Sequence, residues 1–260
     1  MDINVGDVLQ ARYDMVAVAT SYVVSVLGSY AALAHTPHMF NRDGSLKWSM
    51  VVGAAVALGG IGIWTMHFIG MIGYHLPFRV VYEGTLTLVS LAAAIVIAGI
   101  ALVLPGLGGR FSLGGWAVGS VLAGLGVCVM HYMGMFAMNL QAAMNLDMKI
   151  VGLSVAIAIT AAAAALWLAY HVRKTLHRAV AAVVMGLAVC AMHYTGMSAA
   201  EFICVAQTPA SVWGVGGSDL LPVVFGVASV VLAVLTWNVL GIFVEDGPSP
   251  VMAKPRASAF

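Results

Sequence analysis

The sequence predicts an all-α polytopic membrane protein, and three observations support that prediction. Of the 260 residues, 62% are hydrophobic and only 8% are charged, whereas soluble domains usually carry about 25% charged residues. Apolar stretches long enough to cross a hydrocarbon core of about 30 Å recur along the whole chain. These stretches do not alternate between apolar and polar residues as barrel strands do, so we expect helices, which satisfy their own backbone hydrogen bonds in lipid.

Seven segments reach the length of a transmembrane helix, which is roughly 20 residues. We predict spans at 14–35, 48–72, 84–104, 115–138, 149–170, 179–199 and 221–243. Together they form one seven-helix domain over 14–243, preceded by a tail at 1–13 and followed by a tail at 244–260. The first tail contains Asp2, Asp7 and Arg12 and lacks the basic start and short apolar core of a cleavable signal.

Lys and Arg residues are unevenly divided between the two sides of the predicted bundle. Six lie in the loops after the first, third and fifth spans and two lie beyond the last span, against three on the other side. Because cytoplasmic loops carry the excess of positive charge, we predict an outside N-terminus and a cytoplasmic C-terminus in a bacterial inner membrane. The net charge of +1 provides no basic face for nucleic acid.

One six-residue phrase occurs three times, at the end of the second, fourth and sixth spans. It reads Met-His-Phe-Ile-Gly-Met at 66–71, Met-His-Tyr-Met-Gly-Met at 130–135 and Met-His-Tyr-Thr-Gly-Met at 192–197. The preceding spans contain a repeated pattern as well, which starts at Ser21, Ser90 and Ser154. In each copy, small residues stand four and eight positions after the serine, and a leucine stands twelve positions after it. The repeating unit is therefore a helix pair, used three times. Small residues favour close helix packing, so we expect the motif helices near a three-fold axis.

Histidine and thioether sulfur together form a ligand set for soft metal ions. Positions i and i+4 share a helix face, so each histidine and the methionine four residues later point the same way. The predicted orientation places the ends of these helices near the outer membrane face. We expect the metal ligands there to be His67, His131, His193, Met71, Met135 and Met197. Ionisable residues inside a membrane are costly, which favours a functional site over packing, although methionine alone often fills cores. The methionine directly before each histidine is rotated from it by about 100° around the helix axis. These leading methionines either bind the metal or pack around it: Met66, Met130 and Met192.

Aromatic residues follow the three histidines directly, at Phe68, Tyr132 and Tyr194. They are either interfacial anchors or side chains that support the ligands. Eight positions after each histidine stand polar residues that either form an outer mouth over the site or mark the membrane surface: His75, Asn139 and Glu201.

Two further groups of residues receive less specific predictions. Cys128 and Cys190 occupy the position that Trp64 holds in the first copy, which excludes a symmetric thiolate site and favours buried packing. We expect four other histidines to be solvated at the cytoplasmic side: His35, His38, His171 and His177.

With these motifs the chain resembles the MHYT family of bacterial membrane sensor modules, and the phrase Met-His-Tyr-Thr itself stands at 192–195. The resemblance covers about residues 10–243. It implies a copper site near the outer face, built from the motif Met and His residues, and the sensing of a diatomic gas such as O₂, CO or NO. Family members commonly place this module before cyclic-di-GMP enzymes, histidine kinases or DNA-binding domains. We therefore expect the signalling output in a cytoplasmic partner or in a fused domain outside this sequence.

The ligand chemistry leaves two other functions open. Imidazoles and thioethers without a carboxylate favour Cu(I) over magnesium, calcium or manganese, while zinc accepts three histidines but has little use for thioether sulfur. A copper-binding or copper-transfer protein would use the same ligands. A zinc-dependent membrane hydrolase would need a carboxylate base, for which Glu83 and Glu201 are the candidates. We do not expect an enzyme, and we assign no catalytic residue.

Overall fold

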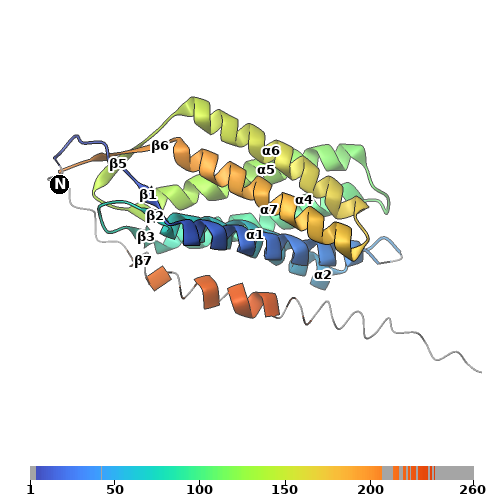
Figure 1. The fold of residues 1–260 in the computed structure, drawn as a ribbon. Helices are drawn as coiled ribbons and strands as arrows, with labels where there is room; N and C mark the ends of the chain where they lie inside the picture. Colours follow the sequence, from blue (N-terminus) through green and yellow to red (C-terminus); the bar gives the residue numbers. More distant parts are fainter. Residues whose placement is uncertain are drawn as a thin grey trace, which may run out of the picture.

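The computed structural model describes residues 4–41, 43–206 and 213–216, together with parts of 219–237. Within these residues, six helices are long and apolar enough to cross a membrane (Figure 1). They are α1 (Met15–His35), the continuous helix formed by α2 (Trp48–Ala55), η2 (Val56–Thr65) and α3 (Met66–Ile72), then α4 (Gly84–Val103), α5 (Leu113–Phe136), α6 (Met148–His171) and α7 (Thr175–Ser198). The helices predicted for the first six spans are thus confirmed, with small shifts at their ends.

The predicted seventh span at 221–243 lies largely outside the described residues. Those that are described at 224–226 and 228–233 are helical, and Val224 and Ala228 belong to the same core cluster as four of the motif methionines, Met71, Met130, Met135 and Met197. The seventh span and the orientation of the chain in the membrane both stay predictions.

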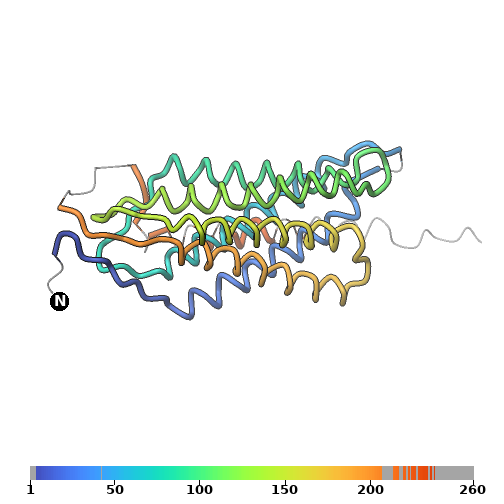
Figure 2. Tube along the Cα trace, turned by 90° about the horizontal axis from the view of Figure 1, so that it is seen from above, coloured from blue at the N-terminus to red at the C-terminus, as the bar shows by residue number. Residues whose placement is uncertain are grey.

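The helices run side by side along one axis, with short strands gathered at one end (Figures 1 and 2). Each helix contacts the next one in the chain, and α7 returns to contact α1, which closes the bundle. The three motif helices also contact one another, because α3 meets α5 and α5 meets α7. The motif helices therefore form the inner layer that the repeat predicted.

Short antiparallel strand pairs close every helix pair at the end that carries the motifs. β1 (Arg12–Tyr13) pairs with β2 (Tyr74–His75), β3 (Val81–Glu83) with β4 (Met138–Asn139), and β5 (Ala142–Leu146) with β6 (Ala200–Cys204), while β7 (Gly214–Gly216) adds to β3. The segment predicted as an N-terminal tail joins this end, since the Leu9 N–H donates to the Phe202 carbonyl at 2.8 Å and Leu9 is buried. The sequence did not predict these strands.

An acidic side chain starts each of the three outer helices at the strand end. Asp14, Glu83 and Asp147 accept hydrogen bonds from backbone N–H groups in the first turns of α1, α4 and α6. A helix start leaves its first N–H groups without partners, and an acidic cap satisfies them and interacts favourably with the helix dipole. The three-fold repeat therefore extends to how the outer helices begin.

The opposite end of the bundle closes around an apolar layer that contains the repeated leucines Leu33, Leu102 and Leu166. The prediction that His35 is solvated here is wrong: its side chain is 0% exposed, and its Nδ1 donates to the Ala31 carbonyl at 2.8 Å. The absence of a side chain at Gly53 makes room for the ring, because a Cβ there would lie 2.5 Å from it. His171 and His177 are exposed, and His38 is half-buried.

Candidate metal centre

The three motif histidines meet at one point between the three inner helices. Their Nδ1 atoms lie 3.0 Å apart for His67 and His193, 3.1 Å for His131 and His67, and 3.3 Å for His193 and His131. The rings stand nearly perpendicular to one another, with interplanar angles of 79°, 90° and 88°. Each side chain is 1% exposed, so the cluster is sealed inside the bundle.

The arrangement of the three Nδ1 atoms is better explained by binding of a shared metal ion than by hydrogen bonds among the three rings. A neutral imidazole has one N–H and one acceptor nitrogen, so a triangle of three such atoms cannot be fully satisfied by internal hydrogen bonds. Three nitrogens bound in a plane to one ion at about 2.0 Å lie about 3.5 Å apart, close to the observed 3.0–3.3 Å. His67, His131 and His193 therefore have the donor atoms and the spacing to hold a metal.

Each imidazole is seated against the glycine of the next motif. A Cβ on Gly134 would collide with Nε2 of His67, one on Gly196 with Nε2 of His131, and one on Gly70 with Nε2 of His193. The contacts run in one direction around the axis, from each repeat to the next. The glycine at the fifth position of the phrase is thus required by the histidine of a neighbouring helix.

The outer nitrogens of the three rings differ from those of most metal sites. Ligating histidines usually donate their second ring N–H to a carboxylate or carbonyl. Here Nε2 of His67, His131 and His193 is buried without a hydrogen-bond partner among the described residues. Packing against glycine, rather than a hydrogen bond, therefore sets the orientation of each ring.

A second cyclic set of contacts surrounds the histidines and uses the repeated serines of the outer helices. The Tyr132 hydroxyl lies 2.8 Å from the Ser154 hydroxyl, and the Tyr194 hydroxyl lies 3.0 Å from that of Ser21. Each bond joins the motif helix of one repeat to the outer helix of the next. The motif tyrosines thus tie neighbouring repeats together, and their rings pack edge to face on the adjacent imidazoles.

The first repeat makes the same connection with a different residue. Phe68 has no hydroxyl, and the Trp64 Nε1–H donates instead to the Ser90 hydroxyl at 3.0 Å. Trp64 occupies the position of Cys128 and Cys190, which are buried, as predicted, and have free thiols. The two departures of the first copy, Phe for Tyr and Trp for Cys, therefore compensate for each other.

Both sets of motif methionines are buried, and their surroundings differ in part. The leading Met66, Met130 and Met192 border a narrow gap beside the three histidines, too small to hold a water molecule. The trailing Met71, Met135 and Met197 pack in a core cluster with Trp64 and Phe68, to which Met130 also belongs. Sequence periodicity favoured the trailing set because it shares a helix face with the histidines, and periodicity alone could not identify the set that borders the gap.

The residues predicted to form an outer mouth occupy equivalent positions in the strand layer. His75 pairs with Arg12, Asn139 with Val81 and Glu201 with Asn145, each as the second residue of its strand. His75 and Glu201 are exposed and Asn139 is half-buried. All three lie in strands, outside the buried histidine cluster. From the same strand layer, Tyr82 packs on Phe68 and Tyr13 packs on Tyr194.

Comparison with known families decides the classification. A family model described as MHYT, bacterial signalling protein N terminal repeat, matches residues 60–118, 124–182 and 186–244, more than half of the chain. The chain belongs to the MHYT family. The first two matched segments each start just before a motif and run past the following outer helix, so the Trp64–Ser90 and Tyr132–Ser154 bonds each lie within one family repeat.

Curated relatives of this MHYT module are signalling proteins. It is 40% identical to the bifunctional diguanylate cyclase/cyclic di-GMP phosphodiesterase MucR of Pseudomonas aeruginosa, over 75% of this chain and 29% of the relative. It is 31% identical to the cyclic di-GMP phosphodiesterase NbdA of the same organism, over 78% and 27%. It is 26% identical to the signaling protein YkoW of Bacillus subtilis, over 75% and 25%. The module thus spans less than a third of these relatives, and no solved structure matches it.

Proposed function

We propose that this MHYT module is a membrane sensor that binds copper through His67, His131 and His193 and responds to a diatomic gas or to the redox or copper state. The observation that supports this most is the convergence of three buried Nδ1 atoms within 3.0–3.3 Å of one another. A group of three intramembrane histidines in equivalent repeat positions is costly to bury and therefore indicates function rather than packing.

Copper is the metal that the surrounding residues favour. The cluster offers three imidazoles, the leading methionines border the gap beside them, and soft thioether ligands select Cu(I). Zinc is the alternative, since it is often bound by three histidines with one open position. A bound copper ion would supply redox chemistry or an open position for a gas ligand. The protein excludes water from the cluster and holds the rings in place with Gly70, Gly134 and Gly196.

The output of the sensor is proposed from its relatives. The names of MucR and NbdA state cyclic di-GMP synthesis or breakdown, so we propose that this module controls a cyclic di-GMP enzyme, either fused to it or bound on the cytoplasmic side. The cyclic Tyr–Ser and Trp–Ser bonds couple each motif helix to the outer helix of the next repeat. A change at the shared centre therefore reaches all three repeats.

The two alternatives find less support in the geometry. A copper-transfer protein needs a path of ligands leading away from the site, and in the apolar cavity beneath the histidines Met185 is the one thioether beyond the motif residue Met192. A hydrolase needs a base beside the metal, and Glu201 lies in an exposed strand position outside the sealed cluster. We therefore expect Glu201→Gln to leave metal content unchanged.

Metal content of purified protein tests the proposal. We expect one copper per chain in the wild type after copper loading and a loss of at least 80% in each of His67→Ala, His131→Ala and His193→Ala. The matched control is His171→Ala, which removes an exposed histidine stacked on Trp167 at the other end of the bundle and should keep the copper. Equal copper in all variants would refute the shared site.

Gas binding is the second half of the test. Addition of CO or NO to the reduced, copper-loaded protein should give a vibrational band of the bound gas that is absent from His131→Ala. Zinc in place of copper, or copper that binds no gas and does not change redox state, would refute the sensing function while leaving the metal site intact.

A further inference from the structure

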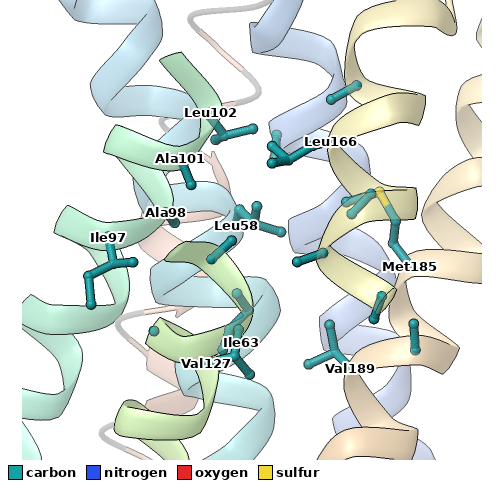
Figure 3. A pocket seen from close by; sticks show the side chains of 18 of the residues that line it. Leu58, Ile63, Ile97, Ala98, Ala101, Leu102, Val127, Leu166, Met185 and Val189 are labelled. Atoms are coloured by element: carbon teal, nitrogen blue, oxygen red, sulfur yellow. The ribbon is translucent and has the colours of Figure 1, made fainter. Parts of the chain in front are cut away.

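An apolar cavity lies along the axis of the bundle, directly beneath the histidine cluster. Its volume is about 70 Å³, well above the roughly 10–15 Å³ that a single water molecule needs, so it has room for a small molecule. On α6 its lining residues run from Ala158 to Ala169, a length of about 16 Å at the rise of a helix. All six helices contribute to its wall (Figure 3).

The repeated sequence pattern explains why this space exists. Alanines of the small-residue positions, including Ala94, Ala98, Ala158 and Ala162, line the cavity, and the leucines at the end of the pattern close its far end. At the motif end the three inner helices converge, while farther along the methyl groups are too small to fill the gap between them. The pattern that brings the helices together at the histidines also leaves the axis empty below.

The wall of the cavity is almost entirely hydrocarbon. Thr36 is the one lining residue with a hydroxyl, and that hydroxyl already donates to the Ala32 carbonyl at 2.8 Å. Water needs two to four polar partners to occupy a cavity, whereas apolar cavities stay dry and bind apolar atoms and molecules such as xenon. The chemistry of this space therefore suits a small uncharged apolar molecule.

The cavity borders the histidine cluster through a narrow ring of branched side chains. Ile63, Val127 and Val189 stand four residues before the three histidines, and they line both this cavity and the narrow gap that the histidines border (Figure 3). Residues four apart lie one above the other on a helix. This ring separates the two spaces, and a diatomic molecule is far better suited to pass it than a lipid chain.

The other approach to the histidines is covered. Phe68 is 0% exposed and Tyr82 is 2% exposed, and their rings pack together above the cluster, while Tyr13 covers Tyr194. We therefore propose that the alanine-lined cavity binds a diatomic gas and delivers it to the histidine cluster through the ring of Ile63, Val127 and Val189, an inference that rests on the proposed gas-sensing function.

Filling the cavity tests this role without any metal. Ala162→Phe places a large ring in the space, whereas Ala164→Phe adds the same ring two residues away on the exposed face of α6. Metal-free wild type and Ala164→Phe should show saturable binding of xenon by xenon NMR, and Ala162→Phe should bind at least tenfold less. Ala98→Leu fills the space from α4 and serves as the second variant if Ala162→Phe does not give a monodisperse protein.

The copper-loaded protein then separates the cavity from the sensor. The association rate of CO should fall at least tenfold in Ala162→Phe and stay unchanged in Ala164→Phe, with equal copper in both. No saturable xenon in the wild type, equal CO rates in all variants, or a tightly bound acyl chain displaced by Ala162→Phe in native mass spectrometry would each overturn the inference. Xenon binding as expected in a copper-loaded protein that binds no gas would support the cavity and refute the proposed function.

Discussion

Gly134→Ala is the substitution that most sharply tests the seating of the histidines. A Cβ at this position would collide with Nε2 of His67, and ordinary contacts of such a carbon begin at 3.4 Å. In a helix that lacks this contact the same change is favourable, because alanine has a higher helix propensity than glycine by about 1 kcal/mol. Helix propensity alone predicts that Gly134→Ala stabilises the protein, whereas the structure predicts that it destabilises the protein.

The size of the effect follows from how little room a metal site allows. To restore an ordinary contact the imidazole of His67 must move by roughly 1 Å, whereas ligand distances in a metal site are defined to about 0.2 Å. Loss of an orienting contact to a ligating histidine costs about 10- to 100-fold in metal affinity, and we expect a loss of that size. Overpacking costs about 1–3 kcal/mol, so after the gain in propensity the free energy of unfolding should fall by about 0–2 kcal/mol.

The assay is copper affinity by competition with a chelator, together with the melting temperature in detergent. Gly152→Ala is the matched control, because no atom lies within 4 Å of a Cβ built at this position of α6. It should keep wild-type copper affinity and melt at the same temperature or higher. Wild-type copper affinity in Gly134→Ala would refute the argument that the glycine holds His67 in place.

Three further predictions test the contacts around the centre. Tyr132→Phe removes the 2.8 Å bond to Ser154, and it should lower the free energy of unfolding by about 0.5–1.5 kcal/mol; a double-mutant cycle with Ser154→Ala should show coupling, and additive effects would contradict the bond. Trp64→Cys removes the bond to Ser90 and should lower the melting temperature. Adding Phe68→Tyr should recover part of that loss, because the double variant has the Cys and Tyr of the other two repeats. No recovery would show that the repeats are not equivalent. Backbone N–H groups of Leu86 and then Thr85 hold the pKa of Glu83 below its ordinary range, so its stabilising effect is present above about pH 4.3 and is lost as the pH falls through the lower folded pKa. The melting temperature of the wild type should therefore exceed that of Glu83→Gln at neutral pH, and the difference should shrink in acid; a difference independent of pH would exclude the charge as the cause.

Much of the fold could be predicted from hydropathy and from the sequence repeat. Long apolar segments predict membrane helices, and repeated segments are expected to adopt equivalent structures. The span predicted at 48–72 has the same bounds in the structure, and the meeting of the three histidines follows from their equivalent places in three helix pairs. The strands could not be predicted, since two-residue strands such as Arg12–Tyr13 depend on the helix ends that bring them together.

The details of the site depend on contacts between repeats, which a single sequence does not display. The serines and the tyrosines were both visible as repeated positions, yet their pairing crosses from one repeat to the next and became clear only in three dimensions. The burial of His35 was missed for the same reason, because the space for its ring is provided by Gly53 on another helix.

X-ray absorption spectroscopy of the copper-loaded protein tests the central claim most directly, because it reports the atoms bound to the metal. The account predicts a shell of three imidazole nitrogens at about 2.0 Å in the wild type and in the exposed-histidine control His171→Ala. The little copper that remains in His131→Ala should lack this shell. Sulfur scattering in addition would show methionine ligation, and its loss in Met130→Leu or in Met135→Leu would identify the set. A copper spectrum without an imidazole shell, or one unaffected by His131→Ala, would contradict a metal centre shared by the three motifs.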